Sequence, residues 1–276
     1  MAYGRAVRAV GGVLACGLLW TGCSGADGRK DPPGGTGSPQ AKTSGDTRSG
    51  EAASPTPVPT GLGFDPDPAR APRTGDAARE LARAVVAGPE LWGPGFVART
   101  PALSAPGHWP VLDEGCVWRS GSFPSDVLHS VTAYSELPAE AGRGPLRVAA
   151  TVTVHRGVRE AEWEMAETLE EALRCPGQKL REGERIAELM SIGSAFGTGG
   201  NFTAEDSIGE LGRYLSAEFD NRPYQYGWFQ SRLGQVTVAA VTKGAAGRTE
   251  NEINKARAEA LTGMMHRLET RLEAAG

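Results

Sequence analysis

Apolar and polar side chains alternate along Leu146-Arg-Val-Ala-Ala-Thr-Val-Thr-Val-His155. The side chains of a β-strand point alternately to its two faces. One face of this stretch is therefore apolar and the other polar, with Val148, Ala150, Val152 and Val154 on the first and Thr151, Thr153 and His155 on the second. The pattern predicts a half-buried antiparallel strand with a hydrophobic core on one side of its sheet.

The segments around this strand predict the remaining elements. Helical spacing predicts helices at 75–87 and 157–173, and a third that begins at Thr249, where Thr249-x-x-Glu252 has capping-box spacing. Further strands are expected at 116–118, 127–135, 184–192, 211–219, 224–232 and 235–242, the last two joined by a tight turn at Leu233-Gly234. The glycine-rich residues 193–209 read as a long mobile loop.

Together these elements predict a single α+β domain at residues 74–276. It would contain an antiparallel β-sheet of about five to six strands with helices packed on one face. The second helix has an apolar stripe and a glutamate-rich side, and we interpret the glutamates as a solvated face: Glu160, Glu164, Glu167, Glu170 and Glu171.

Residues 1–22 read as a targeting segment. Arg5 and Arg8 precede a short apolar run, and the run leads to Thr21-Gly22-Cys23. The layout resembles the signal peptide and lipobox of bacterial lipoproteins, although Trp20 stands where that family usually has leucine. The resemblance implies that Cys23 is diacylated and becomes the mature N-terminus, lipid-anchored at the extracytoplasmic face of the cell membrane. The alternative is an ordinary secretory signal with a chance cysteine.

Residues 23–73 have the composition of a disordered tether. They are rich in Gly, Pro, Ser and Thr, and their only large apolar side chains are Val58, Leu62 and Phe64. Such a segment buries too little apolar surface to offset chain entropy. The net charge of the whole chain is −4, which argues against a nucleic-acid partner because phosphate binding rewards basic surfaces.

Two of the four cysteines fall in the predicted domain. Cys16 leaves with the signal and Cys23 would carry lipid, so Cys116 and Cys175 remain. Outside the membrane, where oxidising conditions prevail, a disulfide between these two is the economical interpretation. A catalytic cysteine paired with a histidine is the alternative.

The order of these features resembles a known family. The anchor and tether are followed by a helix, Cys116-x-Trp118, Thr-Val-Thr-Val-His155, an alanine-rich helix, Cys175-Pro176, a late hairpin and a terminal helix. This is similar to the extracellular sensor domain of mycobacterial PknH-type kinases and related actinobacterial lipoproteins. The resemblance implies an antiparallel sheet with helices and an open cleft for an unidentified ligand. The chain departs from the kinases in lacking a kinase domain and in having one cysteine pair instead of two.

No recognisable catalytic motif is present, so the chain is expected to be non-enzymatic, with no cofactor and no metal. The four histidines are scattered, one on a loop, two on strands and one on a helix: His108, His129, His155 and His266. We read each as structural or surface-exposed. The glycosylation sequon Asn201-Phe-Thr203 is interpreted as a coincidence.

One strand carries a candidate ligand-binding face. Within 224–232, five residues at alternate positions share a side: Tyr224, Tyr226, Trp228, Gln230 and Arg232. Aromatic rings with polar ends could line a cleft for an amphipathic or sugar-like ligand. The alternative is packing beneath a helix.

Three functions follow as hypotheses. The first is a sensor-like lipoprotein that binds an unidentified small molecule, glycan or lipid-like ligand. The second is an extracytoplasmic hydrolase whose residues meet only in the fold, and the third is an adaptor for envelope proteins. A cleft without a catalytic constellation favours the first, a nucleophile with its base favours the second, and a flat exposed apolar patch favours the third.

Overall fold

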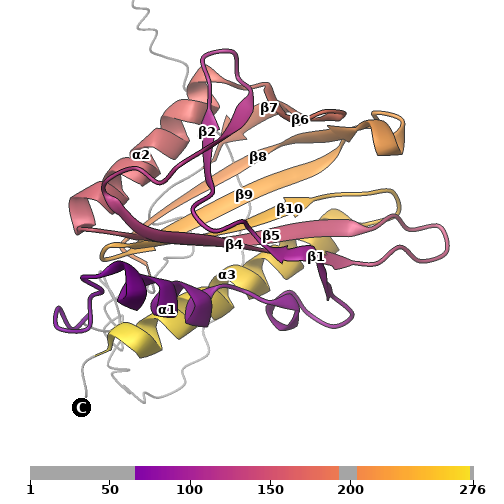
Figure 1. Ribbon diagram of the computed structural model, residues 1–276. Coiled ribbons are helices and arrows are strands. Elements are labelled where there is room, and N and C mark those ends of the chain that lie inside the picture. The colour runs from indigo at the N-terminus through magenta and orange to yellow at the C-terminus, as the bar shows by residue number, and fades with distance from the viewer. Residues whose placement is uncertain (1–65, 193–203, 274–276) are drawn as a thin grey trace, which may run out of the picture. The chain divides into compact units, whose positions relative to one another are not determined.

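The computed structural model describes residues 66–192 and 204–273 (Figure 1). The expected signal peptide, Cys23, most of the expected tether and the sequon at Asn201 lie outside the described residues. The helices are α1 (Gly75–Val85), α2 (Val158–Arg174) and α3 (Glu250–Leu272), with short 3₁₀ turns η1 (Pro89–Leu91) and η2 (Ala217–Phe219). The strands are β1 (Val97–Leu103), β2 (Trp109–Leu112), β3 (Trp118–Gly121), β4 (Val127–Leu137), β5 (Leu146–His155), β6 (Gln178–Arg181), β7 (Glu184–Ser191), β8 (Asp206–Ser216), β9 (Tyr224–Leu233) and β10 (Val236–Lys243).

Eight strands form one antiparallel sheet in the order β1-β4-β5-β10-β9-β8-β7-β6, and β2 and β3 form a separate hairpin. The α+β class and the antiparallel sheet are confirmed. The expected count of about five to six strands is wrong because edge strands such as β1 and β6 were missed. These edges lack apolar alternation: every residue of β1 is exposed or half-exposed, and β6 reads Gln-Lys-Leu-Arg.

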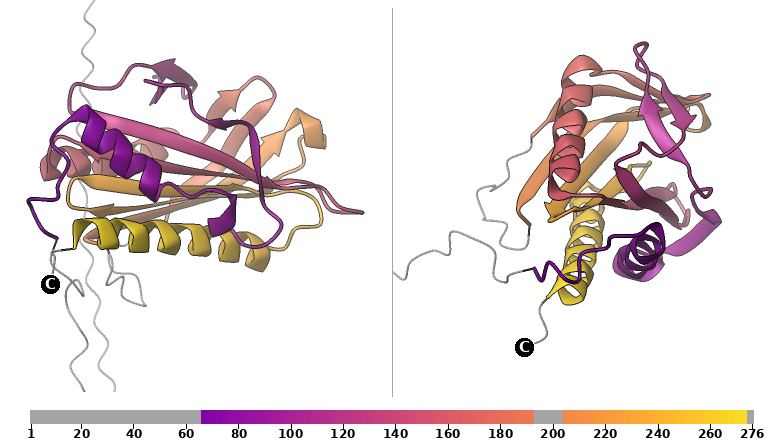
Figure 2. Two further views of the ribbon diagram at one scale, coloured as in Figure 1. Left: turned by 60° about the horizontal axis from the view of Figure 1, so that its bottom comes forward. Right: turned by 60° about the vertical axis from the view of Figure 1, so that its left-hand side comes forward.

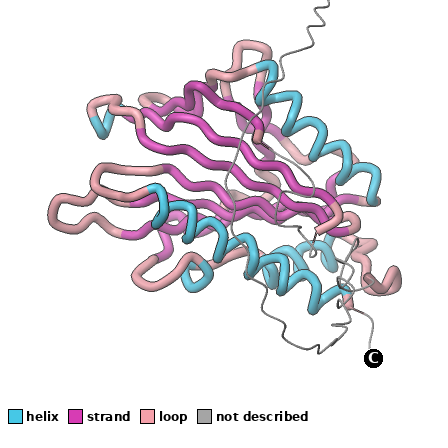
Figure 3. Tube along the Cα trace, turned by 180° about the vertical axis from the view of Figure 1, so that it is seen from behind, coloured by secondary structure: helices cyan, strands magenta, loops and turns pink. Residues whose placement is uncertain are grey.

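The helices lie on both faces of the sheet, so the expectation of one covered face is wrong. Alternate residues of β10 show this directly: Val238 belongs to the core beneath α1 and α3, whereas the neighbouring Thr237 donates a hydrogen bond to Glu164 on α2. Figures 2 and 3 show the strands as one layer with α2 on one side and α1 and α3 on the other. Sequence periodicity identifies the apolar stripe of a helix, but it does not say which face of the sheet that stripe packs against. The expectation of one covered face went wrong at this point.

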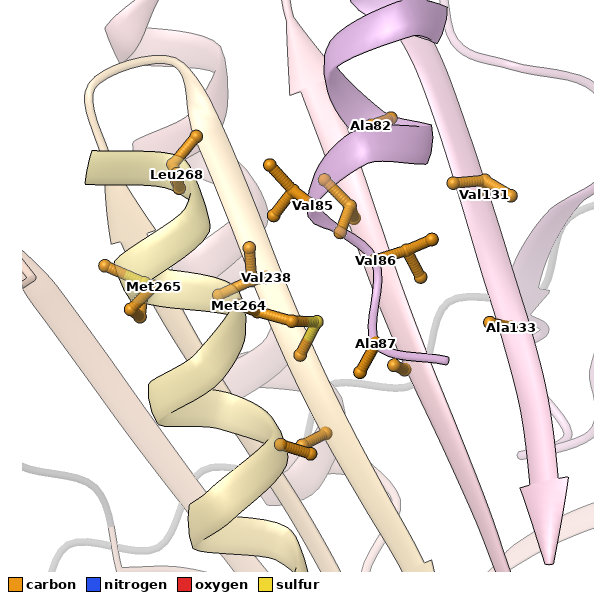
Figure 4. Packing of buried hydrophobic residues seen from close by; sticks show 14 of the residues in the cluster. Ala82, Val85, Val86, Ala87, Val131, Ala133, Val238, Met264, Met265 and Leu268 are labelled. Atoms are coloured by element: carbon orange, nitrogen blue, oxygen red, sulfur yellow. The ribbon is translucent and has the colours of Figure 1, made fainter. Parts of the chain in front are cut away.

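The main core fills the space between the sheet and the pair α1 and α3. Figure 4 shows Val85, Val238, Met264 and Leu268 meeting there from three elements. Burial of such aliphatic side chains is the main source of stability in a domain of this size. The apolar face predicted for residues 146–155 contributes to this core, and Val152 and Val154 are fully buried.

Local geometry confirms the predicted start of α3, whereas two other predicted boundaries are shifted. The Thr249 hydroxyl caps α3 by accepting from the Glu252 amide at 3.2 Å. The β9–β10 turn is occupied by residues 234–235, one position later than expected, with Gly234 at φ +56°. Strand β8 begins at Asp206, so the end of the predicted 193–209 loop is strand, while residues 193–203 lie outside the description.

The start of the described chain lies against its end. The amide of Asp67 donates to the carbonyl of Leu272 at 2.7 Å, and Pro72 is buried. Within the described ranges, none of the helices combines the length and the hydrophobicity that crossing a membrane requires.

Candidate ligand-binding cleft

A disulfide joins Cys116 to Cys175, as the cysteine count predicted, with 5.6 Å between the Cα atoms. Cys175 caps the C-terminal end of α2, and Cys116 lies in the turn before β3. Asp113 shapes that turn, because its carboxylate accepts from the amides of Gly115 and Val117 at 3.0 and 2.9 Å. The bridge therefore attaches the β2–β3 hairpin to the end of α2, and the two stand next to each other above the sheet (Figure 1).

A cleft of about 300 Å³ lies between the hairpin, α2 and the sheet face that α2 covers. Its floor crosses three adjacent strands, since Ala149 on β5 pairs with Tyr134 on β4 and with Val241 on β10. The walls are formed by α2 and by residues of the hairpin. The lining includes His108, Trp109, Trp118, Thr151, Thr153, Glu164, Glu167, Thr168, Glu171, Gln178, Leu180, Glu210, Tyr226, Trp228 and Lys243.

Aromatic side chains enter the cleft from the hairpin and from the sheet. Trp109 and Trp118 come from the hairpin, and Tyr226 and Trp228 come from β9. The indole of Trp118 is held in place by donating to Gln178 Oε1 at 2.8 Å. The indole N–H of Trp228 is buried and has no hydrogen-bond partner within the described ranges. Because buried N–H groups are nearly always bonded, this donor is available to a ligand or water.

Carboxyl groups converge on the cleft from α2 and from β8. Glu164, Glu167 and Glu171 recur at helical spacing, and Glu210 lies directly opposite Trp228 in the β8–β9 pair. The interpretation of the α2 glutamates as one solvated face is therefore wrong for Glu164 and Glu171, which are half-buried here. Glu164 is bound internally, 2.6 Å from both His155 Nε2 and Thr237 Oγ1.

Two of these carboxyls hold their protons to unusually high pH. Burial, reinforced by the neighbouring Glu171, raises the pKa of Glu210 to about 8. Burial, reinforced by Glu167, raises the pKa of Glu171 to about 7. Glu210 is only 6% exposed, and its Oε1 atom has no hydrogen-bond partner in the described chain. A buried carboxyl without a cation favours its neutral form because ionisation would leave a charge in a poorly solvated site.

A basic region adjoins the acidic one. Lys243 donates to Glu184 at 2.9 Å, and Arg181 also pairs with Glu184. Burial alone would raise the pKa of Glu184, but Lys243 and Arg181 outweigh it and hold that pKa at about 2. A second hollow of about 400 Å³ surrounds this group and shares Tyr134, Ala149, Leu180, Val241 and Lys243 with the cleft. The combined groove is acidic at one end and basic at the other.

The five residues predicted on β9 have different environments. Tyr226 and Trp228 line the cleft. Gln230 is buried beneath α2 and accepts from Thr168 Oγ1 at 2.9 Å. Arg232 pairs with Glu205, and Tyr224 packs edge-on against Phe219. The structure thus brings two of the five into the cleft and gives the other three partners within the protein.

The prediction missed the carboxyls and the hairpin tryptophans. Glu210 did carry a signal, because it is an isolated acidic residue among the apolar and small residues of Ile-Gly-Glu-Leu-Gly. The convergence of Glu171 and Glu210 could not be foreseen, since it depends on which face α2 covers.

The four histidines do not meet. His155 is 2% exposed and lies against Glu164, and His108 Nδ1 is 2.8 Å from Ser120 Oγ. His129 packs against Phe123, and His266 lies on the exposed side of α3. Across residues 66–192 and 204–273, no group of three or more His, Cys, Asp or Glu side chains is arranged to hold a metal ion.

Comparison with solved structures gives a distant likeness. No protein-family model matches the chain, and no curated protein matches it. The backbone is similar to the crystal structure of the extracellular domain of PknH from Mycobacterium tuberculosis, at 10% sequence identity and a TM-score of 0.44. The match covers 70% of this chain and 97% of the PknH domain. A likeness this weak carries no inference about ligand or activity.

Proposed function

We propose that this chain is a lipid-anchored lipoprotein of the extracytoplasmic face, and that its domain binds a small ligand without chemical conversion. The observation that carries the proposal is the cleft, whose lining combines tryptophan and tyrosine rings with two buried polar atoms, Glu210 Oε1 and the Trp228 indole N–H, that have no hydrogen-bond partner in the described chain. Ligand sites are typically concave and mostly apolar, with a few polar groups that fix orientation. The Cys116–Cys175 disulfide supports an oxidising location.

The arrangement favours binding over hydrolysis. Two histidines in the described chain approach a catalytic pairing. His108 lies 2.8 Å from Ser120, but Ser120 is exposed and does not line the cleft, and no described carboxylate bonds to His108. His155 contacts Glu164, but His155 is almost fully buried and Glu164 also accepts from Thr237. A glycosidase needs one carboxyl kept as an acid and another kept ionised. In this cleft burial raises the pKa of Glu171 and Glu210 alike, so these two carboxyls do not divide the roles.

The adaptor hypothesis has one observation in its favour. The outer side of α2 exposes Trp163, Leu169 and Leu173, whose exposed fractions are 61%, 41% and 73%. An exposed apolar patch is a common feature of protein interfaces. We place adaptor binding second, because this side of α2 lacks the buried partnerless polar groups that the cleft has.

The anchor is tested by membrane fractionation together with intact mass. We expect the native protein to fractionate with membranes and to have the mass of the chain from Cys23 plus acyl groups. Cys23→Ser should abolish acylation and move the protein to the soluble fraction, because two or more acyl chains are needed for stable anchoring. Cys16→Ser is the matched control, since Cys16 lies in the segment that is removed, and it should change neither result.

A native protein that is soluble and unacylated would refute the anchor. The binding half of the proposal depends on a separate observation, namely whether the protein isolated from its own membrane carries a small molecule in the cleft.

A further inference from the structure

Carboxyl groups outnumber cationic groups among the residues that line the cleft. Carboxyls come from α2 (Glu164, Glu167, Glu171) and from β8 (Glu210), while the cations are Lys243 from β10 and, when protonated, His108 from the loop before β2. Lys243 is bound to Glu184, His108 to Ser120, and Glu164 to His155 and Thr237. The remaining ionisable groups are the Tyr134 and Tyr226 phenols. No arginine is among the lining residues that the structure describes. Among the lining carboxyls, Glu210 has no cation acting on it, whereas Arg174, which lies outside the lining, acts on Glu171.

Glu210 is the group that most requires a partner. The residue is only 6% exposed, and its Oε1 atom makes no hydrogen bond to any described residue. A buried carboxyl left unpaired is costly, and most such groups in proteins have a partner. Glu210 lines the cleft, so a ligand that enters the cleft reaches it.

The aromatic lining supplies a second and independent preference. Trp228 lies directly opposite Glu210 across the β8–β9 pair, and Tyr226 comes two residues earlier on the same strand. The faces of tryptophan and tyrosine rings carry negative electrostatic potential and attract cations, most strongly where water is excluded. Carboxyl groups and aromatic faces lie side by side here, and both favour a positively charged ligand.

We propose that the cleft binds an organic cation, and that the ligand's ammonium group lies beside Glu210 and Glu171 against the rings of Trp228 and Tyr226. This inference rests on the proposed ligand-binding function and names the ligand class. The volume of about 300 Å³ suits a small ammonium compound. An anionic group on such a ligand would lie toward the basic end of the groove, where Arg99, Arg147 and Arg181 gather.

Cation binding at this site is expected to release protons. In the empty cleft the pKa of Glu171 is about 7 and that of Glu210 about 8, because both groups are buried. A bound ammonium group favours the ionised carboxylates and so lowers both pKa values. Affinity should therefore rise as the pH increases from 6 to 9. The variants compared below leave the other charged and titratable groups around the site in place: Glu164, Glu167, Glu170, Arg174, Lys243, His108, Tyr134 and Tyr226.

The experiment compares cations with neutral molecules of the same shape. The full-length chain in dodecyl maltoside micelles is titrated at pH 8.5 with choline and its uncharged carbon analogue 3,3-dimethyl-1-butanol, and with 1,5-diaminopentane and 1,5-pentanediol. Calorimetry and tryptophan fluorescence report binding. At least one cation should bind ten-fold or more tightly than its neutral counterpart. Repeating the cation titration at pH 7, where Glu210 and Glu171 still hold protons, in buffers of different ionisation enthalpy should show proton release. Glu210→Gln should weaken cation binding at least five-fold and leave the neutral compounds unaffected.

Glu80→Gln is the matched control, because it removes the same charge from an exposed position of α1, on the opposite face of the sheet and outside the cleft. Glu171→Gln is the second variant to measure if the Glu210 variant folds poorly. Neutral compounds that bind as well as the cations would overturn the charge assignment and leave the ligand-binding function standing. Equal effects of Glu210→Gln and Glu80→Gln, or no binding of either cation, would overturn the inference as well.

Discussion

Replacing Cys116 and Cys175 together by serine is expected to lower the free energy of unfolding by about 4 kcal/mol. The bridge closes a loop with a sequence separation of 59, so its loss restores a large amount of conformational freedom to the unfolded chain. It also removes the covalent link between the hairpin and the end of α2, so that this wall of the cleft is held only by hydrogen bonds such as Trp118 to Gln178 and Lys179 to the Cys116 carbonyl. Urea unfolding of the double variant and the wild type, with the slopes compared, measures the effect.

Reduction of the wild-type protein with dithiothreitol should lower the free energy of unfolding by the same amount, whereas the stability of the double variant should not change with reductant. A control double substitution of two exposed residues, Ser122→Ala and Ser125→Ala, should cost far less because neither contributes to the core. A double cysteine variant within 1 kcal/mol of the wild type, or two thiols that react freely before reduction, would contradict the bridge.

Glu210→Gln is expected to stabilise the protein at alkaline pH. The pKa of Glu210 is raised to about 8 in the folded state by burial and by Glu171, from an ordinary value of 4.5. A raised carboxyl pKa contributes stability that is fully present below the unfolded pKa and is lost as the pH rises through the folded pKa. Between pH 5 and pH 9 the wild type should thus lose on the order of 4 kcal/mol through this residue, and the glutamine variant should not.

Thermal and urea unfolding across this pH range measure the difference. The curves of the wild type and Glu210→Gln should lie close together at pH 5, diverge as the pH rises toward 8, and run parallel at higher pH. Glu80→Gln, which removes an exposed carboxylate of α1 on the other face of the sheet, should run parallel to the wild type throughout. A Glu210→Gln curve parallel to the wild-type curve at every pH would mean that Glu210 ionises freely in the folded protein. The description of Glu210 as a buried, unpaired carboxyl would then be wrong.

Local patterns predicted much of the scaffold. Strand β5 carries its apolar and polar faces as the alternation indicated, since Val152 and Val154 are in the core while Thr151 and Thr153 line the cleft. The cap at Thr249 and the cysteine pair were likewise predictable, because each depends on residue identity and short-range geometry. In these cases the residues that form the structural feature also form the sequence pattern that predicts it.

The rest depended on three-dimensional packing. The edge strands β1 and β6 carry charged, proline or exposed residues and have no apolar periodicity to detect. The placement of α2 on the opposite face could not be read from its stripe, because both faces of the sheet accept a helix. The cleft followed from that placement: Glu171 comes from α2 and Glu210 from β8, and only the fold brings them together.

The most direct test of the ligand-binding claim is native mass spectrometry of the protein isolated from its own membrane. Ala149→Trp places a large side chain on the cleft floor, between Tyr134 and Val241, and Leu173→Trp adds the same side chain at a position that is 73% exposed. Wild type and Leu173→Trp should each carry the mass of a bound small molecule, and Ala149→Trp should lack it. Wild-type protein with no bound molecule, or the same bound mass in a folded Ala149→Trp variant, would contradict ligand binding in this cleft.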